Sequence, residues 1–181
     1  MITLDLAFDP APAAVIDPKD AAPLRDCLHT PDPWIRELCT WLDAMRQDSP
    51  PACPDSVREA QAFSLGLQFT DDATISSLNG AWRHKPEPTD VLSFAALEEA
   101  PPPFGGDPCV ELGDIIVSVP TARRQAADHG HDLRWELRWL VSHGFLHLLG
   151  WDHPDDGQLA AMVQRQEQLL HNGGMVQHSG E

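Results

Sequence analysis

Four segments of this chain have the hydrophobic pattern of β-strands. Residues 2–8 alternate apolar and polar side chains, as an opening strand with one buried face would. Residues 63–70 repeat that alternation, and a short apolar segment covers 90–95. Residues 110–119 are nearly continuous in isoleucine and valine, which predicts a central strand buried on both faces.

Five other segments place apolar residues at helical spacing. The first begins at Asp32-Pro33, where a capping side chain precedes a proline in the first turn. Its apolar stripe consists of Trp34, Leu38, Leu42 and Met45. The others are predicted to begin after Asp71 or Asp72 and to cover about residues 120–130, 132–150 and 155–171.

Residues 9–33, rich in proline, alanine and aspartate, are predicted to form a loop or a partly ordered insertion, and the proline-rich segment over 48–56 a loop. Residues 173–181 are predicted to form a disordered tail. A length of 181 residues fits one domain, which we expect over residues 1–172. The element order is strand, helix, strand, helix, strand, strand and three helices. This order predicts an α+β fold in which helices pack on a small mixed β-sheet.

Charge narrows the range of functions. The chain has 28 acidic and 12 basic residues and a formal net charge of −16. That balance argues against a broad basic face for duplex nucleic acid and leaves room for a small local positive site. The four cysteines lack CxxC spacing, so we expect reduced thiols. No signal-peptide pattern or apolar run of about 20 residues is present, which predicts a cytoplasmic protein without a membrane span.

Three histidines carry the clearest chemical signal. His143 and His147 lie four residues apart on the helix predicted over 132–150, so their imidazoles project from one face. Gly150 allows the chain to turn back and brings His153 toward the same point. A single histidine in an apolar helix is usually a core residue, but three with a glycine at the bend favour one zinc ion at the C-terminal end of this helix.

The spacing H-x-x-x-H-x-x-G-x-x-H matches the zinc ligands of metzincin proteases. Those enzymes place a glutamate, their general base, directly after the first histidine. Gly144 occupies that position here, so peptidase activity by that route is not expected. Three protein ligands leave one tetrahedral position open, which is typical of a catalytic zinc site.

Basic residues are scarce enough for their positions to be informative. Arg83 and Lys85 flank His84, and Arg83 is the candidate for a phosphate clamp; a surface arginine at a helix end is the alternative. Asp114 and Asp152 are candidates for outer-shell partners of the histidines, or for caps of local turns. A second basic group is expected on the helices leading to the zinc, formed by Arg123, Arg124, Arg134 and Arg138.

The chain resembles the YbeY family of bacterial endoribonucleases, also called rRNA maturation factors. The resemblance covers about residues 75 to 155. Trp151 departs from it, because the family usually has tyrosine there. The matching residues are His143-Gly144-x-Leu146-His147-Leu148-x-Gly150-x-Asp152-His153, Arg83-x-Lys85 with Pro88-Thr89-Asp90-Val91-Leu92-Ser93-Phe94, and Leu112-Gly113-Asp114-Ile115.

The resemblance implies a single-domain α+β metal-dependent hydrolase with one zinc ion bound by His143, His147 and His153. It also implies cleavage of single-stranded RNA, 16S rRNA 3′-end maturation and ribosome quality control, with the ribosome or small-subunit proteins as partners. The functional arginine of the family corresponds to Arg83. The acidic composition indicates that a partner supplies part of the RNA-docking surface.

Several mechanistic alternatives stay open at this point. Zinc would polarise a phosphoryl oxygen or lower the pKa of water, and the RNA 2′-hydroxyl is a rival nucleophile. No general base is assigned. Trp82 or Phe94 would stack bases, unless both are core residues. Two other functions compete with the nuclease: a metal-dependent hydrolase of another substrate, and a ribosome-associated protein whose zinc mainly stabilises the fold.

Overall fold

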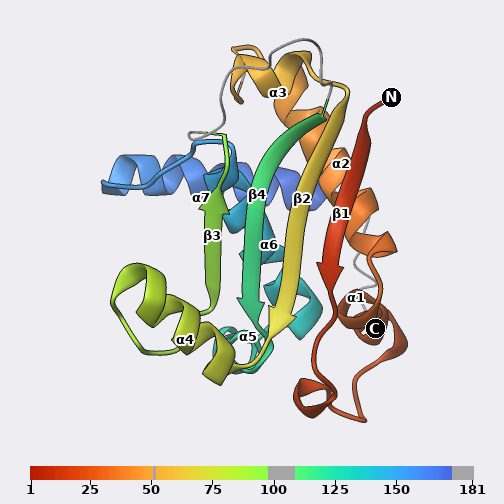
Figure 1. Ribbon diagram of the computed structural model, residues 1–181, viewed down its shortest axis with the longest axis vertical. Helices are drawn as coiled ribbons and strands as arrows, with labels where there is room; N and C mark the ends of the chain where they lie inside the picture. The colour runs from red at the N-terminus through yellow and green to blue at the C-terminus, as the bar shows by residue number, and fades with distance from the viewer. Residues whose placement is uncertain (51, 98–108, 173–181) are drawn as a thin grey trace.

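A computed structural model describes residues 1–50, 52–97 and 109–172 of the chain (Figure 1). Four strands and seven α-helices lie within these ranges. They are β1 (Thr3–Asp9), α1 (Ala22–His29), α2 (Asp32–Gln47), α3 (Asp55–Glu59), β2 (Ala62–Thr70), α4 (Asp72–Arg83), β3 (Val91–Ala95), β4 (Cys109–Ser118), α5 (Val119–His129), α6 (Leu133–Leu148) and α7 (Asp156–Asn172), with a short 3₁₀ turn at Ala13–Val15.

The strands form one mixed sheet in the order β1-β2-β4-β3. β1, β2 and β4 are parallel, and β3 pairs antiparallel with β4. This arrangement confirms the predicted α+β fold with a small mixed sheet. β4 is in the centre, as its isoleucine and valine content predicted, and its register with β2 shifts between Ser64 and Leu65. Gly113 at this shift has a φ of +127°, and a β-carbon there would lie 2.0 Å from the Phe94 carbonyl oxygen.

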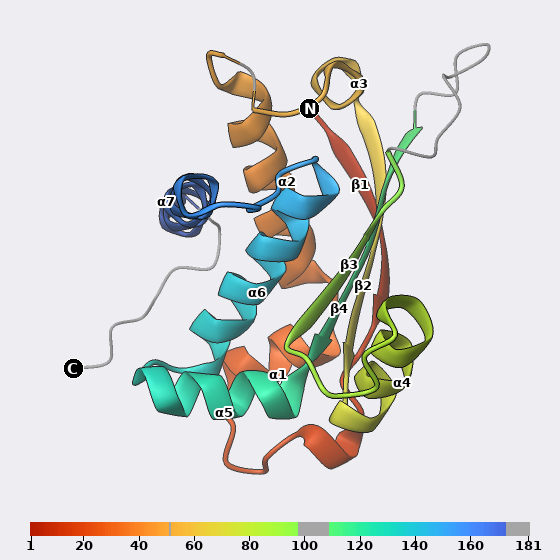
Figure 2. The ribbon, with the colours of Figure 1, turned by 90° about the vertical axis from the view of Figure 1, so that its left-hand side faces the viewer.

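Helices cover the two faces of the sheet unequally. Figure 2 shows α1, α2, α5, α6 and α7 on one side of the sheet and α4 on the other. The main core lies on the side of the sheet that α6 covers and includes Trp34, Trp41 and Phe145, all fully buried. The Trp41 indole N–H donates a hydrogen bond to the Leu169 carbonyl oxygen at 3.0 Å, which ties α2 to α7. Under α4 a smaller apolar cluster consists of Ile75, Leu92 and Ile116.

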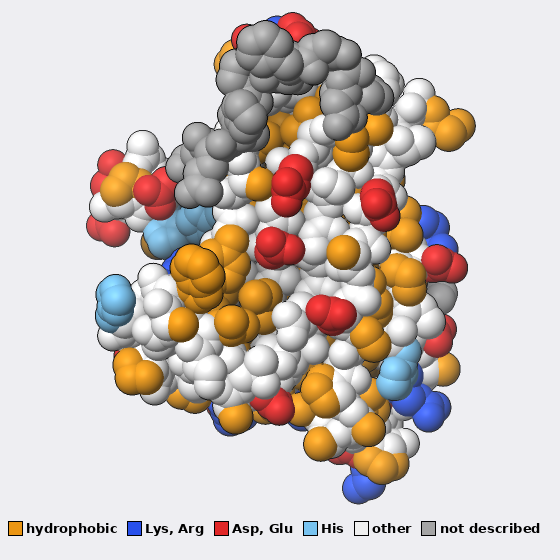
Figure 3. Space-filling view, in the orientation of Figure 1, with side chains coloured by type: hydrophobic (Ala, Val, Ile, Leu, Met, Phe, Trp, Pro, Cys, Tyr) orange, Lys and Arg blue, Asp and Glu red, His pale blue; other side chains and the backbone are white. Residues whose placement is uncertain are grey.

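Beyond α4, the second face of the sheet is open and acidic. Exposed carboxylates point outward from Asp5 and Asp9 on β1 and from Glu111 and Asp114 on β4. Space-filling Figure 3 shows acidic side chains dispersed among neutral and apolar ones over this face. A polyanion such as RNA would meet repulsion from these carboxylates.

Residues 9–33, predicted as a loop or a partly ordered insertion, contain a helix that the sequence did not predict. Within them α1 is a helix of 8 residues whose Cys27 and Leu28 are buried. The Trp34 indole N–H donates to the Cys27 carbonyl oxygen at 2.7 Å, and the Ala11 N–H donates to the Leu28 carbonyl oxygen at 2.9 Å. α1 is therefore stabilised by tertiary contacts that its own proline- and alanine-rich sequence does not reveal.

Residues 48–56 and 173–181 are the other segments predicted to lack regular structure. The segment over 48–56 is mostly irregular, as predicted, but α3 begins within it at Asp55. The predicted tail over 173–181 lies outside the described residues. The apolar core runs from Ile2 to Leu170, and the single domain over 1–172 stays a prediction. Within the described ranges, no helix is both long and apolar enough to span a membrane.

Acid sensitivity is expected at the contact between α5 and the segment before α1. Both guanidinium nitrogens of Arg123 donate to Asp20, at 2.8 and 2.9 Å, and these hydrogen bonds hold the pKa of the Asp20 carboxyl below its usual value. The resulting stabilisation is present above the unfolded pKa, near 4, and is lost as pH falls through the lower folded pKa.

We expect Asp20→Asn to lower the free energy of unfolding by about 1–2 kcal/mol at pH 7, since Arg123 is partly exposed. The difference from wild type should shrink below pH 4. Urea unfolding at pH 7 and pH 3 measures both effects. Asp5→Asn, on the open face, is the matched control and should leave the free energy of unfolding unchanged at pH 7 and at pH 3. A deficit of Asp20→Asn that persists unchanged at pH 3 would contradict the ion-pair explanation.

Candidate metal centre

The C-terminal half of α6 presents two histidines on one face. α6 starts at the Asp132 cap, whose carboxylate accepts the Trp135 backbone N–H at 2.7 Å, and it is buried along most of its length. His143 and His147 are one turn apart, their ring centroids are 4.6 Å apart, and their Nε2 atoms are 3.0 Å apart. The predicted pairing of these two imidazoles is present in the structure.

The turn after α6 brings the third histidine to the same place. Gly150 has a φ of +94°, in the left-handed region that favours glycine, and its N–H donates to the His147 carbonyl oxygen. The chain then reverses, and the His153 ring lies 5.3 Å from each of the other two rings. The three histidines place one ring nitrogen each within 4.8 Å of the others.

Hydrogen bonds at the far side of two imidazoles orient their free nitrogens. His147 Nδ1 lies 2.8 Å from the Trp151 carbonyl oxygen and His143 Nδ1 lies 3.4 Å from Gln166 Oε1. Both oxygens are acceptors, so the network assigns the N–H to Nδ1 in each ring. The Nε2 lone pairs then face each other, as ligands of one metal ion must.

Gln166 is a site residue that sequence reasoning missed. It lies on α7, is only 1% exposed, and donates to the Trp139 carbonyl oxygen at 3.1 Å. Its amide is therefore held in one orientation with the oxygen toward His143. The available signal was a polar residue in the buried stripe of α7, between Met162 and Leu169.

Electrostatics keep the paired imidazoles neutral. Burial is the main cause that lowers the pKa of His143 and of His147 below the usual histidine value. A neighbouring protonated histidine would repel a second positive charge, and this repulsion lowers the pKa of each ring further. Neutral imidazole is the form that binds a metal, so the donor set fits a zinc ion or a similar transition metal.

Arg83 lies within electrostatic range of this site. It occupies the last turn of α4, its side chain is exposed, and its charge contributes to the lowered pKa of His147. His84, with a φ of 59°, ends the helix in a left-handed cap. Among the described residues, Arg83 has no ion-pair partner, which leaves its guanidinium available to an anion. Trp82 beside it is 68% exposed and stacks edge-on against Phe94, whose other neighbours are core residues.

The second predicted basic group does not form an RNA-facing surface. Arg123 is paired with Asp20, and Arg124 with Asp72. Arg138 is buried and binds Glu37 on α2. Arg134 is half-buried on α6. Three of these four cations therefore neutralise carboxylates within the chain.

The two aspartates proposed as outer-shell partners have other positions. Asp114 is exposed on the open face of the sheet, while the next residue, Ile115, faces α6, because successive side chains alternate along a strand. Asp152 accepts the backbone N–H of His153 at 2.8 Å and so caps the local turn. The hydrogen bonds that orient the imidazoles come from Gln166 and from the Trp151 carbonyl oxygen instead.

The glycine that replaces the metzincin glutamate has a packing role. A β-carbon on Gly144 would lie 3.0 Å from Ile115 Cγ2 and 3.3 Å from its Cγ1. Position 144 therefore points at β4, and a glutamate there would be directed into the sheet. The absence of a base at this position follows from the close approach of α6 to β4.

Gly144→Ala is expected to lower the free energy of unfolding by about 1–3 kcal/mol, because the buried, β-branched Ile115 has little freedom to move. Chemical denaturation measures the loss. Gly157→Ala, in the first turn of α7 with only an Asp155 oxygen at 3.4 Å, is the matched control and should be neutral or slightly stabilising. Equal stability of the two variants would show that the α6–β4 contact is not tight.

The described fold and its three-histidine site are of the kind found in metal-dependent hydrolases. A family model described as Endoribonuclease YbeY matches residues 43–174. The chain is 56% identical over 176 residues to Endoribonuclease YbeY of Synechococcus sp. (strain CC9311), covering 97% of this chain and 99% of that protein. Identity to Endoribonuclease YbeY of Prochlorococcus marinus (strain MIT 9313) is 53% over 178 residues, with coverage of 98% and 94%.

Similarity in structure agrees with similarity in sequence. The solution structure of TM1509 from Thermotoga maritima matches with a TM-score of 0.50 at 20% identity, over 93% of this chain and 88% of that chain, which shows a shared fold. The chain belongs to the endoribonuclease YbeY family, whose members are metal-dependent nucleases. Trp151 stands where the family usually has tyrosine. It fits this fold, since its indole N–H donates a hydrogen bond to the Ala52 carbonyl oxygen at 2.9 Å.

Proposed function

We propose that this chain is a zinc-dependent, single-strand-specific endoribonuclease that matures the 3′ end of 16S rRNA and serves ribosome quality control in the cytoplasm. The observation that carries the proposal is the convergence of His143, His147 and His153, with two of the rings oriented through Nδ1. Family membership supports RNA as the substrate.

The three histidines would hold the metal through one ring nitrogen each. Zinc bound to three imidazoles supplies a Lewis acid with a free coordination position. The protein contributes the orientation: Gln166 and the Trp151 carbonyl oxygen keep the Nε2 atoms of His143 and His147 directed at one point. Because these supports are backbone or buried groups, the site is preorganised before substrate arrives.

Arg83 would bind the phosphate at the scissile bond. Its guanidinium is exposed, uncommitted among the described residues, and close enough to influence His147. A planar guanidinium binds two phosphate oxygens at once and stabilises charge that grows on them in the transition state. The exposed ring of Trp82, next in sequence, offers a stacking surface for an unpaired base, which favours single-stranded RNA.

The distribution of charge supports a role for a partner. The open face of the sheet carries exposed carboxylates, and most arginines of α5 and α6 are neutralised within the chain. A ribosomal or small-subunit protein would supply the additional contacts that hold the RNA against this acidic molecule. Cleavage of free RNA is therefore expected to be weaker than cleavage of the ribosomal substrate.

Arg83→Ala is expected to lower kcat/KM for a labelled single-stranded RNA by about 10²–10³-fold, the usual effect of removing one preorganised donor to a developing charge. Bound zinc should not change. Arg83→Lys should recover part of the loss, since it restores the charge without the planar geometry. Arg36→Ala, an exposed arginine on α2, is the matched control and should cleave like wild type.

Three outcomes would contradict the proposal in different ways. Equal cleavage by wild type, Arg83→Ala and a metal-site variant would identify a contaminating nuclease. Zinc-dependent peptide turnover with intact RNA would point to a hydrolase of another substrate. No cleavage of free or ribosomal RNA, together with unfolding on removal of zinc, would indicate a structural metal in a ribosome-associated protein.

A further inference from the structure

A second group of metal-ligating side chains lies at the corner between α5 and α6. His129 is in the last turn of α5, His131 follows it across Gly130, and Glu136 is in the first turn of α6. One ligand atom from each of the three lies within 4.8 Å of the others. We refer to His129, His131 and Glu136 as the corner site.

The backbone that carries the corner site is fixed by two helix caps. Gly130 has a φ of +72°, and its N–H donates to the carbonyl oxygens that end α5. The His131 N–H donates to the Ala126 carbonyl oxygen at 3.1 Å, and Asp132 then caps α6. The two histidines are therefore held on either side of a defined turn, directly before the helix that supplies the carboxylate.

The side chains converge on one carboxylate oxygen. His131 Nε2 contacts Glu136 Oε2, and His129 Nδ1 lies 4.0 Å from the same oxygen. The two imidazole rings are 5.6 Å apart. The Glu136 side chain is only 3% exposed, whereas that of His129 is 63% exposed. A buried carboxylate thus faces two imidazoles, and the cluster opens to solvent on the His129 side, where an ion can enter.

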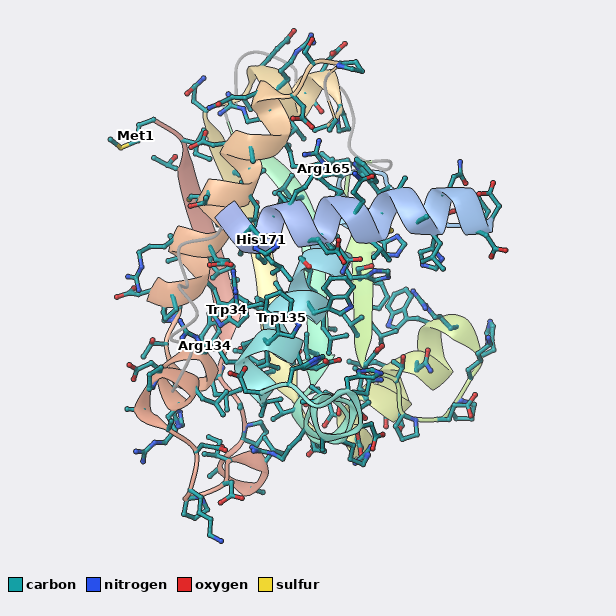
Figure 4. All side chains as sticks on the ribbon, turned by 180° about the vertical axis from the view of Figure 1, so that it is seen from behind. Met1, Trp34, Arg134, Trp135, Arg165 and His171 are labelled. Carbon is teal, nitrogen blue, oxygen red and sulfur yellow. The ribbon has the colours of Figure 1, made fainter. Side chains whose placement is uncertain are left out.

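Electrostatic surroundings favour a cation at the corner site. A cavity of about 490 Å³ beside it is lined by Asp90 and Glu167 in addition to Glu136. No lysine or arginine is among the described residues that line this cavity. Figure 4 shows Trp135, which also lines it, near the start of α6. A buried carboxylate is costly unless it is paired, and a bound divalent ion would be such a partner.

We propose that the corner site binds a second divalent transition metal ion, zinc being the probe of choice. Two imidazole nitrogens and one carboxylate oxygen form a donor set suited to zinc and its neighbours rather than to magnesium or calcium, which prefer oxygen ligands. The ion would join the end of α5 to the start of α6 and so stiffen the helix that carries His143 and His147.

The role of this ion is structural. Glu136 and His143 are seven residues apart on α6, which corresponds to about 10 Å along the helix axis. Catalytic two-metal sites hold their ions about 3.5–4 Å apart. One phosphate cannot bridge the corner site and the three-histidine site, so loss of the second ion should lower thermal stability and leave the chemistry of the first site unchanged.

The test is the number of zinc ions bound by the full chain at buffered free zinc, combined with the zinc-dependent rise in Tm. Wild type should bind two ions and His129→Ala one, with a smaller rise in Tm for the variant. His147→Ala should retain one ion, and the His129→Ala/His147→Ala double variant none. Because the His129 side chain is mostly exposed, its removal should leave the fold intact.

His129→Lys separates a metal site from a simple ion-pair cluster, because lysine keeps a positive charge near Glu136 without supplying an imidazole ligand. The proposal requires this variant to bind one ion, like His129→Ala. It is overturned if wild type binds only one ion, or if either His129 variant still binds two. Since His147→Ala reports the three-histidine site separately, failure of the corner site would leave the proposed nuclease untouched, and the reverse also holds.

Discussion

His147→Ala is expected to remove one bound zinc ion and to lower kcat/KM for single-stranded RNA by at least about 10³-fold. The metal supplies several kcal/mol of transition-state stabilisation, and each 1.36 kcal/mol corresponds to about tenfold in rate. The Nε2 of His147 lies 3.0 Å from that of His143, and its ring lies 5.3 Å from that of His153. Metal content per chain and cleavage of a labelled RNA oligonucleotide, measured on the same preparation, give both values.

The matched control for this experiment is His29→Ala, which removes an exposed histidine at the end of α1. It should bind as much zinc and cleave RNA as fast as wild type. Circular dichroism must show that His147→Ala is folded, since the proposal concerns the metal and not the helix. A folded His147→Ala variant that has lost zinc but cleaves at the wild-type rate would separate the three-histidine site from catalysis.

The largest effect on stability is expected at the ion pair between α2 and α6. The Arg138 guanidinium donates to Glu37 Oε1 at 2.9 and 2.7 Å and to the Leu170 carbonyl oxygen at 2.7 Å, so it joins α2, α6 and α7. Arg138 is 2% exposed and Glu37 is fully buried. Removal of one member breaks this buried ion pair, which costs about 3–5 kcal/mol.

Arg138→Met should therefore lower the free energy of unfolding by about 3–5 kcal/mol, and Tm by about 2–4 °C for each kcal/mol in a chain of this size. Urea denaturation and calorimetry provide the two measurements. Arg58→Met is the matched control, because the Arg58–Asp55 pair is exposed and such pairs contribute about 1 kcal/mol or less.

A double variant tests the cause of that loss. Glu37→Leu combined with Arg138→Met removes both charges, and it should recover much of the stability lost in Arg138→Met alone. If the double variant were as unstable as the sum of its single variants, packing around these side chains would be responsible and the buried-charge explanation would fail.

The sequence alone was sufficient for most of the regular elements and for the metal-binding signal. Apolar alternation predicted β1 and β2, apolar runs predicted β3 and β4, and helical spacing predicted α2, α4, α5, α6 and α7. Histidines at positions 143 and 147, with Gly150 and His153 after them, were recognisable because one helical turn and one left-handed glycine determine their proximity locally. Interactions between residues close together in the chain produce a repeating pattern of residue types that can be read from the sequence.

The tertiary structure decided the features that depend on residues far apart in the chain. α1 is stabilised by long-range packing, the register of β4 turns Asp114 away from the histidines, and Gln166 reaches His143 from α7. Arg123 and Arg138 belong to the second predicted basic group, yet they bind carboxylates 103 and 101 residues away. A sequence shows which charges exist but not which of them are paired, because pairing depends on how the helices pack.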